Sequence, residues 1–250
     1  MKTTYCLQVH QSHDTSMMVC LNDIPVYDRS LGNEARGTTI APDQWLVPGV
    51  NTLSLTMKSG EVGPTTAIST VLRDAVTNTK LATVTWPDDF STPTESAPLG
   101  TRKATVSLPE THERPIFMNA SRSLLPREGN EESWACLEAI VAAFRAGDAD
   151  RVFEAIRTKS DEHHRFHGVD ESAPETVRRV VNERVQEPYW MLPLDRTLTI
   201  FEPCADGRLH RVTRLDGRPV IFGYPATTKA PVYAMNPFLI LTRDGYQLLF

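Results

Sequence analysis

The sequence holds few cysteines, and no two of them are close together. The chain of 250 residues has four, and they form no C-x-x-C pair: Cys6, Cys20, Cys136 and Cys204. In a chain of this size we expect buried thiols in a reducing compartment. A Cys6–Cys20 disulfide between neighbouring strands is the alternative, for a protein exported without a cleaved signal.

Long apolar runs are also missing. No segment approaches the roughly 18 consecutive apolar residues that a membrane-spanning helix requires. Residues 1–10 contain one basic residue and lack the apolar core of a signal peptide, and they alternate as a strand does. The sequence therefore predicts a cytoplasmic protein that does not bind membranes.

Positive charge is not concentrated anywhere in the chain. The formal net charge is −5, and the 26 Lys and Arg residues are scattered. The densest group alternates between the two faces of a strand-like region: Arg208, Arg211, Arg214 and Arg218. Nucleic acids usually need a basic stripe, so we predict no nucleic-acid partner. No feature indicates an oligomeric state.

Motifs of catalysis and of cofactor binding are missing as well. The chain contains no G-x-S-x-G nucleophile elbow, no Walker A sequence and no G-x-G-x-x-G. Cys136 lies next to an apolar stripe, which is typical of a core residue. No cofactor is predicted, and the case for an enzyme is weaker than the case for a binding protein.

Alternating apolar and polar residues dominate the first part of the chain. Clear period-two segments are residues 5–10, 52–57, 81–86 and 103–108. One polar and one apolar face per segment indicate antiparallel strands over a single core. Turn-forming residues separate the segments, so we predict an antiparallel β-sandwich over residues 1–110.

Two turns in this region carry a family resemblance. Leu21-Asn22-Asp23-Ile24-Pro25-Val26 is followed, after a loop, by Trp45-Leu46-Val47-Pro48-Gly49-Val50-Asn51 and an alternating strand. This order resembles the galactose-binding-like jelly rolls found beside glycoside hydrolase domains, over about 40 residues. The resemblance implies a jelly-roll fold more than it implies a ligand.

The second part of the chain changes character. Prolines interrupt residues 111–129, which are predicted to form a connector. Residues 130–187 show helical spacing, with Asn130 as a candidate N-cap and a last helix opening near Ser172. From residue 195 on, Asp-Gly pairs at 206, 216 and 244 predict hairpins. The fold class is α+β: a sandwich, then a domain over residues 130–250 with three helices and an antiparallel meander sheet.

The helices also carry a resemblance. The phrase Ala143-Phe144-Arg145-Ala146-Gly147-Asp148-Ala149-Asp150 is similar to the first helix-turn of the NTF2-like, or SnoaL-like, α+β family. The resemblance covers the last 120 residues or so. It implies a cone-shaped pocket that binds small molecules or a surface that docks proteins.

Candidate site residues fall into three groups. His163 and His167 lie four apart and would share a helix face that could chelate a metal; a polar helix end is the favoured alternative. Four polar residues of the meander could serve acid–base chemistry in a pocket, or could be structural: Asp195, His210, Tyr224 and Tyr233. Tyr27 and Trp45 could form a sugar-stacking surface, although aromatic residues in sandwiches are more often core.

These observations favour a non-catalytic, cytosolic protein that binds another protein. A more specific hypothesis is an immunity or adaptor protein for a bacterial effector. Two alternatives stay open. A carbohydrate-binding module would use Tyr27 and Trp45, and an NTF2-like small-molecule-binding enzyme would use the polar residues of the meander.

Overall fold

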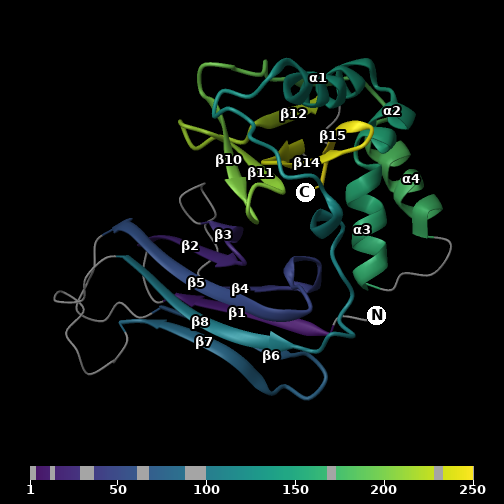
Figure 1. Ribbon diagram of the computed structural model, residues 1–250. Coiled ribbons are helices and arrows are strands. Elements are labelled where there is room, and N and C mark those ends of the chain that lie inside the picture. The colour runs from purple at the N-terminus through teal and green to yellow at the C-terminus, as the bar shows by residue number, and fades with distance from the viewer. Residues whose placement is uncertain are drawn as a thin grey trace. The chain divides into compact units, whose positions relative to one another are not determined.

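A computed structural model describes residues 4–11, 15–28, 37–60, 68–87, 100–167, 173–227 and 233–249. The chain divides into two compact units, Met1–Pro115 and Ile116–Phe250. Helices occur in the second unit, and antiparallel sheets occur in both (Figure 1). The predicted α+β class is confirmed.

The first unit contains two four-stranded antiparallel sheets, ordered β4-β1-β6-β7 and β3-β2-β5-β8. Its strands are β1 (Tyr5–Gln11), β2 (Thr15–Leu21), β3 (Ile24–Asp28), β4 (Gly37–Ile40), β5 (Gly49–Gly60), β6 (Ile68–Asp74), β7 (Lys80–Trp86) and β8 (Gly100–Leu108). Period two places alternate side chains in the core, where Leu7, Leu53 and Leu55 are fully buried. The predicted antiparallel strands are confirmed, and the two sheets fit a β-sandwich.

The two turns quoted above are joined by hydrogen bonds. Asn22 and Asp23 have φ values of 52° and 62°, as expected for a tight hairpin turn between β2 and β3. The Asn22 side chain donates to Asn51 Oδ1 at 2.8 Å and to the Trp45 carbonyl at 3.0 Å. Asn51 Nδ2 in turn donates to the Val47 carbonyl at 2.7 Å. Asn51 is fully buried and fixes both turns.

The second unit has four helices among the residues that the structure describes. They are α1 (Glu131–Ala146), α2 (Ala149–Ala155), α3 (Arg157–His167) and α4 (Ala173–Arg184). Three helices were predicted, and the structure has a fourth because the helical segment between Asp148 and His167 breaks at Ile156 into α2 and α3. The buried residues of α3 are Ser160, Glu162 and Phe166. Glu162 accepts the backbone N–H of Ile116 at 2.6 Å and pairs with Arg165 at 2.7 Å.

Helix α1 begins as its sequence predicts. Asn130 is the N-cap, and its side chain accepts the Ser133 N–H at 2.9 Å while the Ser133 hydroxyl accepts the Asn130 N–H. The apolar residues that recur at helical spacing in α1 are all buried: Trp134, Leu137, Ile140, Val141 and Phe144. Ser172, where the last helix was predicted to open, lies outside the described residues.

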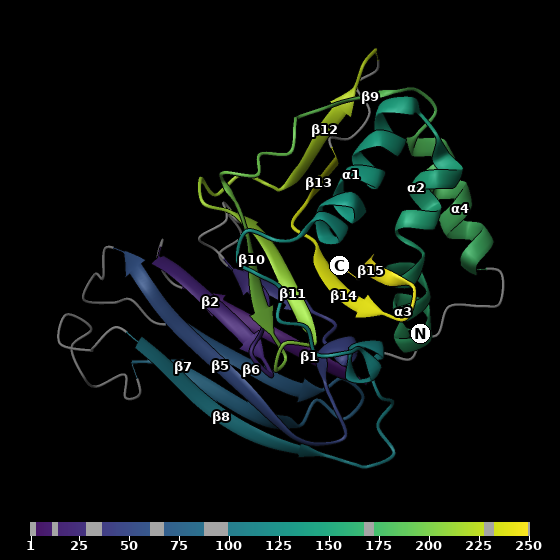
Figure 2. The same cartoon turned by 45° about the horizontal axis from the view of Figure 1, so that its top comes forward.

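The strands of the second unit form two antiparallel sheets, β10-β11-β14-β15 and β13-β12-β9. Their bounds are β9 (Tyr189–Met191), β10 (Thr199–Cys204), β11 (Leu209–Arg214), β12 (Ile221–Pro225), β13 (Tyr233–Met235), β14 (Phe238–Thr242) and β15 (Gly245–Leu248). In Figure 2, α1 lies alongside the β13-β12-β9 sheet.

The predicted single meander was wrong. The Asp-Gly pairs at 206 and 244 do join hairpins, but the strands on either side of Asp216-Gly217 do not pair with each other. Asp216 closes this turn locally, because its carboxylate accepts Arg214 Nη2 at 2.7 Å and the Arg218 N–H at 3.2 Å. The chain then leaves β11, which pairs with β14, and enters β12, which pairs with β9 and β13.

The segment predicted as a connector is packed from residue 116 onward. Phe117, Ala120 and Leu125 are buried in the second unit. Arg208 of the β10–β11 hairpin donates to the carbonyls of Met118 at 2.8 Å and Ala120 at 3.0 Å. The segment begins with a short 3-10 helix, Ile116–Asn119, and the side chain of Arg208 satisfies two of its backbone carbonyl groups at and just after this helix.

Candidate functional site

The outward face of the β13-β12-β9 sheet carries three aromatic side chains, Trp190, Phe222 and Tyr224, which we name the aromatic face. Trp190 lies on β9 and the other two on β12. Strand alternation turns their neighbours, such as Met191 and Ile221, into the core, where both are buried. The sheet thus has one side packed in the unit and one aromatic side left open.

The rings of the aromatic face are stacked edge to face. Trp190 and Tyr224 are cross-strand partners with centroids 5.1 Å apart and ring planes at 83°. Tyr224 and Phe222 follow with centroids 6.3 Å apart and planes at 73°. Trp190 nevertheless remains 64% exposed. Edge-to-face pairs of this kind hold rings in fixed orientations before any ligand arrives.

A glycine makes room for Met191 behind this face. A Cβ on Gly223 would lie 2.2 Å from Met191 Sδ and 3.2 Å from the Trp190 carbonyl. A side chain at this position would therefore displace the Met191 side chain, which packs over β12 on the buried side of the sheet. The antiparallel register of β12 and β9 places Tyr224 opposite Trp190.

A second feature is a cavity of about 280 Å³, which we name the helix cavity. It lies among the helices and the ends of β9 and β13. Its lining is mostly apolar: Phe144, Val152, Ile156, Lys159, Thr176, Val177, Val180, Val181, Arg184, Val185, Tyr189 and Tyr233.

Two titratable groups of the helix cavity are perturbed by burial. Burial lowers the pKa of Lys159, because its ammonium form is poorly solvated there. Burial also raises the pKa of Tyr233 to about 12, so that its hydroxyl stays protonated at neutral pH. Tyr233 packs on Phe144 with centroids 4.2 Å apart. Perturbed groups in a cavity are common at functional sites.

The four polar residues predicted for one pocket lie in different places. Tyr233 lines the helix cavity, and Tyr224 belongs to the aromatic face. Asp195 holds a turn: its Oδ1 accepts the Thr197 hydroxyl at 2.7 Å, and such hydrogen bonds lower the pKa of this carboxyl.

His210 is buried on β11, and neither ring nitrogen meets a partner at full hydrogen-bonding geometry. Burial lowers the pKa of His210, against a smaller opposing effect of the Ser123 backbone. We therefore expect a neutral imidazole at pH 7. The structure does not bring His210 together with the other three residues as a site.

The histidines predicted as metal ligands both lie on α3, which extends to His167. His163 is exposed, with its ring centroid 6.3 Å from that of His164, and the side chain of His167 lies outside the described residues. Among the side chains that are described, no group of three or more His, Cys, Asp or Glu could hold a metal ion.

The residues predicted to stack on sugars are buried. Tyr27 is 4% exposed and Trp45 is 5% exposed. Trp45 belongs to a short 3-10 helix, Asp43–Trp45, whose three residues are all buried. Neither ring offers a face to a sugar.

Sequence reasoning missed Trp190, Phe222 and Lys159. The alternation of Phe222, Gly223 and Tyr224 could have placed the two aromatic residues on one face. Trp190 could not be assigned, because its strand is only three residues long. Lys159 lies on α3, which has no apolar stripe that would have indicated which of its faces is buried.

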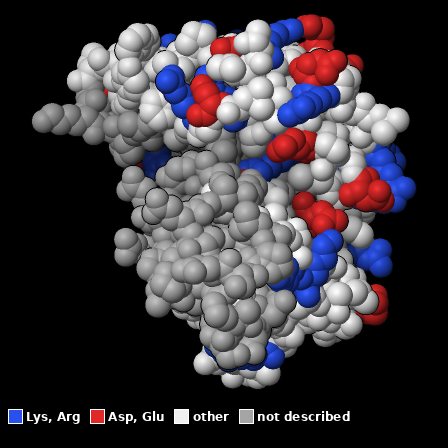
Figure 3. Space-filling view, turned by 90° about the vertical axis from the view of Figure 1, so that its left-hand side faces the viewer, with Lys and Arg blue, Asp and Glu red and all other residues white. Residues whose placement is uncertain are grey.

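No protein-family model, curated protein or solved structure matches this chain. Within the described residues, no helix has both the length and the apolar character needed to cross a membrane. Acidic and basic side chains are interspersed in the space-filling view of Figure 3. The two family resemblances therefore stay predictions.

Proposed function

We propose that this is a non-catalytic protein that binds another protein through the aromatic face. The observation that carries the proposal is Trp190, a large ring that is 64% exposed and held by Tyr224 rather than packed in a core. Tryptophan and tyrosine dominate the energetically important residues of protein interfaces. A rigid aromatic anchor also loses little conformational entropy on binding.

The ring geometry favours a protein over a glycan. Linear sugars stack best on rings that share one plane, but the neighbouring rings here stand at 83° and 73°. Perpendicular rings present an edge beside a face, which suits insertion into an apolar pocket of a partner protein. The carbohydrate-binding alternative is also less favoured because Tyr27 and Trp45 are buried.

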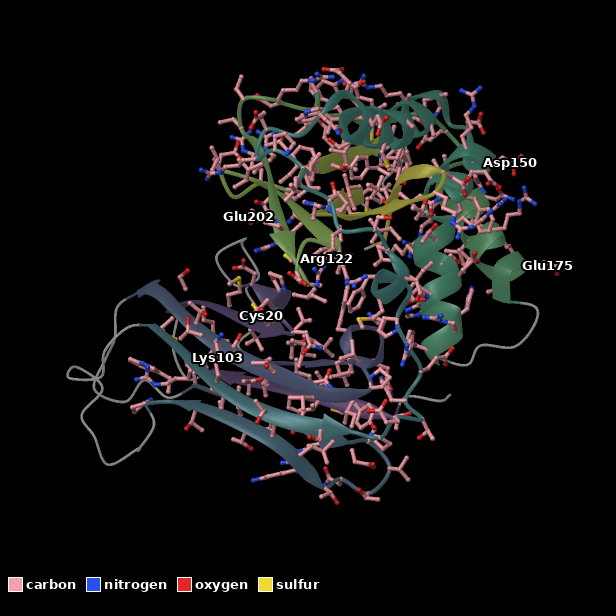
Figure 4. The ribbon with its side chains drawn as sticks, viewed as in Figure 1. Cys20, Lys103, Arg122, Asp150, Glu175 and Glu202 are labelled. Atoms are coloured by element: carbon pink, nitrogen blue, oxygen red, sulfur yellow. The ribbon has the colours of Figure 1, made fainter. Side chains whose placement is uncertain are left out.

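The more specific proposal is a cytoplasmic immunity or adaptor protein for a bacterial effector. A reducing compartment is supported by the four cysteines, because none of them forms a disulfide. Cys20, labelled in Figure 4, is buried on β2 and forms no disulfide with Cys6. The alternative of an exported protein with a Cys6–Cys20 bridge is therefore not adopted.

The family resemblances are part of the proposal. The pair of four-stranded sheets in the first unit supports a jelly-roll relative of the galactose-binding-like modules. Support for an NTF2-like second unit is weaker, because its strands divide between two sheets. An NTF2-like enzyme is less favoured for a further reason: of its four proposed polar residues, Tyr233 alone lines the helix cavity.

The proposal is tested by capture from native lysate with an N-terminal tag, followed by binding measurements with the purified partner. Three proteins are compared: wild type, Trp190→Ala and Leu215→Ala. Leu215 is a matched control, because it is 60% exposed in the same unit but lies outside the aromatic face. We expect Trp190→Ala to weaken binding by roughly thirtyfold or more, which corresponds to a hot-spot loss of about 2 kcal/mol.

Two results would contradict this proposal. A partner that binds wild type and Trp190→Ala equally well would place the interface elsewhere. If no stoichiometric partner is captured at micromolar concentration, the proposal that this protein binds another protein is contradicted. Both variants should keep the wild-type melting temperature, since each truncates an exposed side chain.

A further inference from the structure

We propose that the helix cavity binds a small monocarboxylate with a short apolar tail, and that Lys159 is the counter-ion of its carboxylate. The ligand would lie within the second unit, among α1, α2, α4 and the ends of β9 and β13. This inference is independent of the aromatic face.

The apolar walls of the helix cavity are incompletely packed. Val177 and Val180 belong to the apolar stripe of α4, yet both are only half-buried because they border the cavity. On the opposite side lie the buried rings of Phe144 and Tyr189, in edge-to-face contact at 5.1 Å. Apolar side chains that border empty space gain dispersion contacts when an apolar group fills that space.

The charge of the lining has one sign. It includes Lys159 and Arg184 and no acidic residue. Lys159 forms no hydrogen bond or ion pair with any residue that the structure describes. A desolvated ammonium group without a counter-ion is unfavourable, and an incoming carboxylate would pair with it where water competes poorly.

One acidic residue of α2 is paired with an arginine of α4. Asp150, labelled in Figure 4 at the start of α2, accepts Arg178 Nη2 of α4 at 2.8 Å. The Arg178 guanidinium also lies over the Phe153 ring, 5.5 Å from its centroid. These contacts join α2 to α4, two of the helices that line the cavity.

The volume limits the size of the ligand. Small-molecule sites usually measure ~300–1,000 Å³. At about 280 Å³, the helix cavity lies just below this range. We therefore choose octanoate as the probe, with octanol as an uncharged probe of the same tail length.

The test is calorimetric titration of the full-length protein with each probe. Wild type is compared with Lys159→Met, which keeps the side-chain length without the charge. Lys103→Met is the matched control, because Lys103 is exposed on β8 of the first unit. We expect octanoate to bind wild type and the control with equal affinity. Its affinity for Lys159→Met should be lower by roughly tenfold or more, because one charged hydrogen-bond partner is lost. Octanol affinity should not fall in Lys159→Met.

A second measurement uses the wild-type protein alone, so it does not depend on whether a variant folds. In protein labelled with ¹³C-lysine and titrated with pH, one ε-methylene signal should show a titration midpoint that rises when octanoate is added, because a carboxylate partner favours the charged amine. The proposal is overturned if octanoate shows no saturable binding, if octanol binds wild type as tightly as octanoate, or if no lysine signal responds.

Discussion

Lys159 holds a charged amine beside apolar side chains, and this placement costs folding free energy. We expect Lys159→Met to stabilise the protein at pH 7 by about 0.5–2 kcal/mol, a gain typical of removing a functional but unfavourable group. The measurement is urea unfolding followed by circular dichroism, with Lys103→Met as the reference. An unchanged or lowered midpoint in Lys159→Met would contradict the burial of this charge.

The same group predicts a pH dependence. The pKa of Lys159 is lowered in the folded state from its ordinary 10.5, so the unfolded chain binds more protons between those two values. Wild-type stability should therefore gain from this group as pH rises through that window. In Lys159→Met this gain should be missing, which would appear as convergence of the two unfolding midpoints at high pH.

At the scale of elements, the hydrogen bonds of Asn51 join two turns of the first unit. Its Oδ1 accepts the Val47 N–H at 2.8 Å, and its Nδ2 donates to the Val47 carbonyl at 2.7 Å. Its Oδ1 also accepts a hydrogen bond from the Asn22 side chain. Asn51→Ala would leave these buried groups unpaired, so we expect a loss of about 2–4 kcal/mol.

The control for Asn51 is Thr56→Ala on the same strand, β5. Thr56 shares an exposed hydrogen bond with Thr101 at 2.9 Å, so its loss should cost less than about 1 kcal/mol. Chemical unfolding monitored by circular dichroism compares the two variants. Equal midpoints would show that the turn network adds nothing beyond ordinary strand pairing.

Gly223 leaves space on the buried side of β12 for the Met191 side chain of β9. Gly223→Ala places a methyl group against Met191 Sδ, so we expect a loss of about 1–3 kcal/mol from overpacking. The loss should be smaller when measured in a Met191→Ala background, because the clashing sulfur is then gone. A double-mutant cycle on thermal unfolding measures this coupling. If the losses of stability in the two single variants simply add in the double variant, Gly223 and Met191 are not in contact.

Elements with a clear apolar period could be predicted from sequence, and the others could not. The stripe of α1 and its Asn130 cap are confirmed because each signal is local. The break between α2 and α3 was not predicted because it falls at Ile156, where the sequence has neither the glycine nor the proline that usually marks a helix end. The meander was wrong because an Asp-Gly pair determines a turn, whereas pairing beyond the turn depends on distant contacts such as Gly223 against Met191. For the same reason, the candidate site residues could not be grouped correctly.

At the scale of the whole molecule, the second unit has a core of its own. Residues from all parts of the unit meet there, including Trp134, Val181, Ile221 and Leu239. We expect residues 116–250, expressed alone, to fold cooperatively, since a unit with its own core can fold independently. A dispersed amide spectrum by NMR is the expected result. A collapsed spectrum would show that the first unit is required for folding.

The exposure of Trp190 gives the protein an internal spectroscopic reporter. Of the four tryptophans, Trp45, Trp86 and Trp134 are at most 5% exposed, whereas Trp190 is 64% exposed. Collisional quenchers such as iodide should therefore extinguish the emission of one indole and leave the other three almost untouched. Shielding of that quenchable fraction would report occupancy of the aromatic face without any label, for whatever molecule is added.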